Sequence, residues 1–157
     1  VDDFSAPTTP VTINAGATLD TSAKAAYSLA GVATTIGVGP ATAGFFNAGA
    51  GTLTLGNSLS LDFSSGSPAA SYDLYDAGAV SGNFSSVTLT GLFSGSLSLG
   101  AGTWSGTFGG YDFSLAQSTG LLSIAVSSVP EPANLALVMG AACLGLLAWR
   151  KRRPASV

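Results

Sequence analysis

The chain's candidates for acid–base or calcium chemistry are two closely spaced carboxylate pairs, Asp2/Asp3 and Asp73/Asp76. On a strand, Asp73 and Asp76 would point to opposite faces because successive side chains alternate. That arrangement disfavours a shared acid–base site. An EF-hand loop needs more oxygen ligands at set positions than either pair supplies. We therefore expect turn residues and solvated carboxylates here, with no metal site and no cofactor.

The absence of histidine and the single cysteine exclude several further classes of site. Ser–His–Asp catalysis needs an imidazole base, and Cys/His zinc sites and disulfide frameworks need more than one cysteine or histidine. A glycosidase that uses only carboxylates remains as an alternative, with Asp73, Asp76 and Asp112 as its acids. We expect the chain not to be an enzyme.

Charged residues are few, at 8%, and they are segregated along the 157 residues. Residues 1–132 hold eight acidic side chains against Lys24 alone, a net charge of −7, whereas residues 133–157 hold four basic side chains and no acidic one. An acidic body repels a phosphate backbone, so nucleic acid is not an expected partner.

The basic end follows two other unusual segments. The first is Val129, Pro130, Glu131 and Pro132, whose prolines favour an extended backbone. The second is residues 133–149, which carry no charge. As an α-helix they would be about 25 Å long, near the lower limit for spanning a bilayer, and they lack the polar face of a soluble helix. We predict a transmembrane helix over 133–149.

Four consecutive bases, Arg150, Lys151, Arg152 and Arg153, follow this apolar segment directly. By the positive-inside rule they place the C-terminus in the cytoplasm and the acidic body on the other side of the membrane. Moving them across a membrane potential is costly, at about 2.3 kcal/mol per charge for 100 mV. We expect them to act as a stop-transfer cluster.

Together, residues 129–153 resemble the PEP-CTERM sorting signal of Gram-negative bacteria. The resemblance implies that Pro130, Glu131 and Pro132 are recognised by an exosortase, a membrane-embedded cysteine protease or transpeptidase that cuts at or near them. It further implies an exported protein that passes through the inner membrane and ends at the cell surface or in the extracellular matrix. Such proteins carry a signal peptide; because the chain begins at Val1, we expect it to have been removed or to lie upstream.

The remaining residues, 1–128, form a body that is rich in Gly, Ala, Ser and Thr. From residue 52 onward, apolar and small polar residues alternate, as in Thr52–Phe63, which predicts half-buried strands. Clusters such as Asp76–Gly78 and Ser81–Asn83 predict turns. We predict an all-β body, less regular over residues 1–50.

Two segments, Val11–Asp20 and Ala50–Leu59, share a pattern of an apolar residue, small residues with glycine, and then Thr-Leu. They resemble rungs of autotransporter-associated β-strand repeat proteins, which implies a β-solenoid. An antiparallel β-sandwich fits the alternation as well, and both architectures stay open.

The large aromatic residues of the body, Tyr72, Tyr75, Trp104 and Tyr111, are expected in the core, since the chain has few bulky residues to fill it. If exposed, they would instead stack on sugars. The resemblance of residues 129–153 to the sorting signal implies an exosortase and the membrane as partners, and a place in the matrix would add exopolysaccharide. The alternative function is a permanently membrane-anchored adhesin or carbohydrate-binding module.

Overall fold

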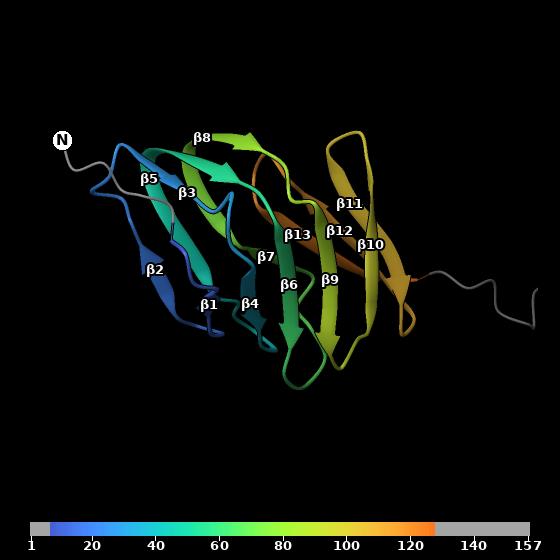
Figure 1. Cartoon of the computed structure of the whole chain (residues 1–157). Helices are drawn as coiled ribbons and strands as arrows, with labels where there is room; N and C mark the ends of the chain where they lie inside the picture. Colours follow the sequence, from blue (N-terminus) through green and yellow to red (C-terminus); the bar gives the residue numbers. More distant parts are fainter. Residues whose placement is uncertain (1–6, 128–157) are drawn as a thin grey trace, which may run out of the picture. The chain divides into compact units, whose positions relative to one another are not determined.

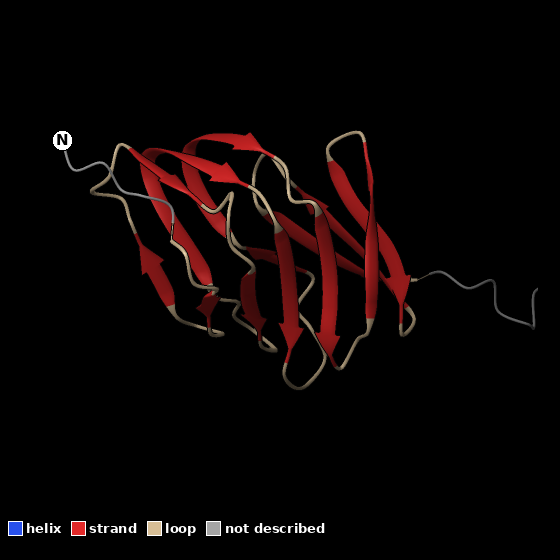
Figure 2. Ribbon diagram, in the orientation of Figure 1, coloured by secondary structure: helices blue, strands red, loops and turns tan. Residues whose placement is uncertain are grey.

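The computed structural model of the chain describes residues 7–127. These residues form strands joined by loops, as Figure 2 shows, and they include no helix that would cross a lipid bilayer. The predicted sorting segment, residues 129–153 with its helix at 133–149, lies outside the described residues. Within the described range, the all-β prediction for the body is confirmed.

Four parallel strands stack side by side and begin the larger of two sheets (Figure 1). They are β1 (Val11–Ile13), β4 (Thr34–Val38), β6 (Ser58–Phe63) and β9 (Ser86–Gly91). Val11 pairs with Thr34, Thr34 with Leu59, and Leu59 with Val87, so successive coils are 23, 25 and 28 residues long. Parallel neighbours at such regular spacing are the coils of a β-solenoid.

The same coils contribute to a second, four-stranded parallel sheet. Its strands are β2 (Thr18–Asp20), β3 (Ala26–Ser28), β5 (Phe45–Leu55) and β8 (Tyr75–Gly82). The long strand β5 pairs with β2 near its start and with β3 near its end. Strand β8 lies along the other edge of β5, with register shifts between Asn47 and Thr52. The solenoid prediction therefore holds for the first three coils.

The larger sheet continues beyond the coils with antiparallel pairing. The added strands are, in spatial order, β10 (Gly95–Gly100), β11 (Thr103–Phe108), β12 (Tyr111–Ala116), β13 (Leu121–Val126) and β7 (Ser71–Asp73). Nine strands thus form one sheet, of which the first four are parallel and the rest join antiparallel. The antiparallel alternative correctly describes the pairing of this last part, although not the architecture of the whole.

Alternating leucines fill the interior of the solenoid. Leu53, Leu59 and Leu61 are fully buried, on the phase that the sequence predicts, and Leu115 and Leu122 continue the core under the antiparallel strands. Each such side chain is stabilised by about 1.5–3 kcal/mol on burial.

Aromatic rings pack together in the core near the turn between β9 and β10, which contains Phe93. The rings of Phe63, Phe93 and Phe113 meet edge to face, with centroids 5.0–5.6 Å apart. Edge-to-face contacts of this kind add to the stabilisation that burial provides.

The core assignment of the large aromatic residues is confirmed for three of the four. Tyr72, Tyr75 and Trp104 have 4–6% of their surface exposed, and Tyr111 is half-buried and packs against the core. The Tyr72 hydroxyl donates to the carbonyl of Gly39 at 2.7 Å. The three buried rings are therefore not sugar-stacking platforms in this fold.

Two details of the sequence prediction are wrong. Val11–Asp20 and Ala50–Leu59 are not equivalent rungs: β1 pairs with β4, and β2 with the start of β5. Residues 75–82, expected to contain two turns, form strand β8, whose backbone pairs with β5. Pairing with a preformed neighbour outweighs the local turn preference of Gly and Asp.

Candidate functional site

Hydroxyl groups occupy matching positions on the outer face of the larger sheet. Ser98 pairs with Ser105, Ser105 with Ser114, Ser114 with Ser123, and Ser123 with Ser71, so one row of serines crosses five strands. Each serine adjoins a core-facing residue along its strand, such as Leu97 or Leu115, and so points outward.

The row extends onto the solenoid coils. Val87 pairs with Leu97 in antiparallel register, so Ser86 lies opposite Ser98. At the other edge of β9, Ser86 pairs with Ser58. A second row on the same face runs through Thr12, Thr35, Ser60, Thr88 and Ser96. We call these two rows the hydroxyl face; its members are Ser58, Ser86, Ser98, Ser105, Ser114, Ser123, Ser71, Thr12, Thr35, Ser60, Thr88 and Ser96.

The hydroxyl face is an extended hydrogen-bonding surface; Asp62, Asp73 and Asp112 lie on the same side of the sheet, each two residues along its strand from a member of a row. Neighbouring strands lie about 4.8 Å apart, so the seven-strand row of serines is about 29 Å long. Every hydroxyl can donate and accept. Beside it, the Thr90 hydroxyl donates to the Asp62 carboxylate at 3.2 Å. Such a face can exchange hydrogen bonds with water or with a hydroxylated polymer.

Where the parallel coils end, Gln117 joins three strands of the fold. Its side chain is 5% exposed. The Oε1 atom accepts from Trp104 Nε1 at 2.7 Å and from the backbone N–H of Phe84 at 3.3 Å. The Nε2 atom donates to the carbonyl of Gly82 at 3.5 Å and to Asn83 Oδ1. All four hydrogen-bonding positions of the amide are thus used.

The side-chain amide of Gln117 makes hydrogen bonds with the backbone at the end of β8 that a neighbouring strand would otherwise make. The pairing of β8 with β5 ends at Gly82, so the following peptide groups lack a ladder partner in that sheet. Gly82 also has a φ of 70°, and an added Cβ would overlap the carbonyl oxygen of Leu55, which is why only glycine fits there. Gln117 accepts from Phe84 and donates to Gly82 as a peptide group of a neighbouring strand would.

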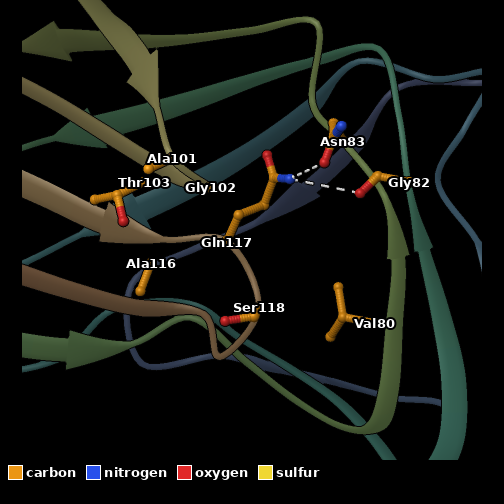
Figure 3. Close-up of a pocket in the computed structure, with 9 residues that line it drawn as sticks. All are labelled: Val80, Gly82, Asn83, Ala101, Gly102, Thr103, Ala116, Gln117 and Ser118. Carbon is orange, nitrogen blue, oxygen red and sulfur yellow. Dashed lines mark hydrogen bonds between the residues drawn. The ribbon is translucent and has the colours of Figure 1, made fainter.

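A cavity of about 400 Å³ opens at this junction, as Figure 3 shows. It is lined by Val80, Gly82, Asn83, Ala101, Gly102, Thr103, Ala116, Gln117 and Ser118. None of these side chains is ionisable. The lining mixes small apolar groups, two hydroxyls and two amides, and Ala101 adopts a φ of 49° at the rim. The volume lies in the range of ligand sites.

The phenol of Tyr75 lies behind Gln117 and is buried with it. Its hydroxyl donates to the backbone carbonyl of Gln117 at 2.5 Å. Burial raises the pKa of Tyr75 above its usual value, because the phenolate would lose its hydration, although a hydrogen bond with the Gly120 backbone opposes this effect. The phenol is therefore a neutral donor that holds residue 117 in place.

The structure separates Asp73 from Asp112, which lie on strands at opposite edges of β13. Asp73 pairs with Leu121 and Asp112 with Ala125, four residues apart along β13, or about 13 Å. Asp76 lies in the other sheet. Carboxyl pairs of glycosidases lie about 5–9.5 Å apart. Among residues 7–127, no three acidic, cysteine or histidine residues form a metal-binding group.

The predicted sorting residues cannot be related to this geometry. Val129, Pro130, Glu131 and Pro132, and the cluster Arg150, Lys151, Arg152 and Arg153, lie outside the described residues. Asp2 and Asp3 do so as well.

Sequence reasoning missed Gln117, although a signal was present. It is the only glutamine of the chain, and it continues the inward phase of Phe113 and Leu115. A polar residue on a buried phase needs hydrogen-bond partners, and that requirement points to a junction.

Comparison with known proteins assigns no relative: no protein-family model, no curated protein and no solved structure matches the chain.

Proposed function

We propose that the chain is a non-enzymatic, exported protein of the cell surface or extracellular matrix, delivered by exosortase processing of its C-terminal segment. The observation that carries the proposal is the order of three segments in the sequence: Val129–Pro132, the uncharged residues 133–149, and the bases Arg150–Arg153. An extended motif outside the membrane, an apolar anchor and a cationic stop are what a membrane-embedded protease needs to hold its substrate.

The described body supports the same proposal. A solenoid of short coils is stabilised by contacts between neighbouring coils. The hydroxyl face offers a row of serine hydroxyls about 29 Å long to a hydrated polysaccharide. Exopolysaccharide is therefore the second proposed partner, after the exosortase.

Mass spectrometry of the C-terminal peptide tests the sorting step. In a bacterium with an exosortase, the mature surface protein should lack Arg150–Arg153. Replacing Pro130 and Pro132 by alanine should leave the tail intact. A matched control replaces Pro40 and Pro68 of the body by alanine, and there cleavage should continue. An intact basic end on wild-type protein recovered from the cell surface would refute processing.

The alternative, a membrane-anchored adhesin or carbohydrate-binding module, keeps the apolar segment 133–149. Carbonate extraction of native membranes distinguishes the two functions. A retained helix stays in the membrane pellet, whereas a processed body is released or moves to the matrix fraction.

A further inference from the structure

The junction cavity combines space, a fixed wall and free hydrogen-bonding groups. Its volume is about 400 Å³, which lies in the range of small-molecule sites. Four of its lining residues are alanine or glycine: Gly82, Ala101, Gly102 and Ala116. Their lack of long side chains leaves the volume open and exposes the backbone at the wall.

The back wall is fixed by the Gln117 network. The amide is held by Trp104, Phe84, Gly82 and Asn83, so it does not rotate to fill the cavity. The backbone N–H of Gln117 also donates to the Gly102 carbonyl at 3.1 Å, which ties the two rims together. A wall of this kind is preorganised, which lowers the entropic cost of binding.

Three polar groups of the lining are left for a ligand. Within the described part of the chain, no residue is hydrogen-bonded to the Thr103 hydroxyl, the Ser118 hydroxyl or Asn83 Nδ2. Asn83 is oriented by Gln117, and Figure 3 shows its nitrogen turned away from that residue. The site therefore offers two groups that donate and accept and one that only donates, beside the apolar Val80 and Ala116.

We infer that this cavity binds one neutral sugar unit of a polysaccharide. The lining has no ionisable side chain to pair with a charged ligand. A pyranose presents hydroxyls that match the free groups and C–H faces that match the alanines and valine. The inference rests on the proposed matrix function for the source of the ligand, and it is specific to the cavity rather than to the hydroxyl face.

Isothermal titration of the full chain with neutral hexasaccharides (cellohexaose, maltohexaose and mannohexaose) and with acidic hexagalacturonate tests the inference. At least one neutral probe should bind, more tightly than hexagalacturonate. Ala116→Met, which fills the cavity, should lower the association constant at least tenfold. Thr103→Val should lower it about three- to tenfold, as expected for one hydrogen bond.

The matched controls are Ala125→Met and Thr52→Val, which change the same residue types away from the cavity; neither should alter binding. Thermal unfolding of each variant separates lost binding from lost folding. In the wild-type chain, where folding is not in question, amide shifts of Gly82 and Gly102 should move on titration. Saturable binding by none of the neutral probes, shifts confined to other residues, or equal binding by Ala116→Met would overturn the inference. The sorting proposal is tested separately: if the sugar inference fails but the surface protein still lacks Arg150–Arg153, the sorting proposal stands.

Discussion

Replacing Gln117 by leucine tests whether one buried amide holds the coils and the antiparallel strands together. The variant keeps an apolar volume but leaves Trp104 Nε1 and the Phe84 N–H without their acceptor. Both residues are under 10% exposed, and each unsatisfied buried donor costs about 1–3 kcal/mol. Because leucine recovers part of this by burial, we expect a loss of about 3 kcal/mol in the free energy of unfolding.

Urea unfolding followed by circular dichroism measures this loss, with Ser118→Ala as the neighbouring control. The control should stay within about 0.5 kcal/mol, since the Ser118 side chain is exposed. A double-mutant cycle with Trp104→Phe isolates the indole contact and should give a coupling of about 1–2 kcal/mol. A loss below about 1 kcal/mol for Gln117→Leu would refute the account of this junction.

Gln117→Glu extends the same test to pH. The carboxylate keeps the acceptor for Trp104 but faces the Gly82 carbonyl and Asn83 Oδ1, which both need a donor. Burial and these acceptors raise the pKa of the new carboxyl in the folded state above its unfolded value of about 4.3. The folded variant then binds more protons than the unfolded one, so its deficit relative to wild type grows as pH rises from about 4.3 through the folded pKa. A deficit independent of pH would contradict this arrangement.

Three other changes have defined outcomes. Burial raises the pKa of Tyr75 above the unfolded value of about 10, so the contribution of this phenol to the free energy of unfolding is fully present below pH 10 and decreases above it. In Tyr75→Phe, which has no phenol to ionise, urea unfolding between about pH 9 and 11 should show a smaller decrease. Gly82→Ala should cost about 2–4 kcal/mol in thermal unfolding, whereas Gly100→Ala, with open space around it and a negative φ, should change stability by less than about 1 kcal/mol. Thr34→Val should raise the urea midpoint by the equivalent of about 1 kcal/mol, because the buried Thr34 hydroxyl has no partner within residues 7–127; an unchanged or lower midpoint would contradict this.

Alternation predicted the inward residues well but not which strands pair. The odd-numbered leucines of Thr52–Phe63 are buried as expected, even though the chain turns at Asn57, whose φ is 54°, and passes from one sheet to the other. Because the turn keeps the phase, alternation alone does not mark it, although Gly56 and Asn57 are residues that favour turns. Pairing depends on contacts 23–28 residues apart, which local propensity does not encode.

The hydroxyl face was partly foreseeable for the same reason. Alternation assigns Ser98, Ser114 and Ser123 to the outer face of their strands. That they lie in one row follows only from the register, which is set by the core: Trp104 opposite Leu115 and Leu115 opposite Leu122. A slip of one residue would bury serine and expose leucine, so the packing of the core fixes the outer row.

The junction cavity could not be predicted, because it exists where two kinds of strand pairing meet. In the larger sheet β10 pairs with the last parallel strand, β9, whereas in the smaller sheet, among residues 7–127, β8 pairs only with β5 and no antiparallel strand continues that sheet. Gln117, directly after β12, supplies hydrogen-bond partners to Phe84 and Gly82 at the end of β8, and the cavity lies beside it. The side-chain amide of Gln117 thus both completes the hydrogen bonding of β8 and lines the cavity. A substitution that breaks these hydrogen bonds should therefore also change the volume of the cavity.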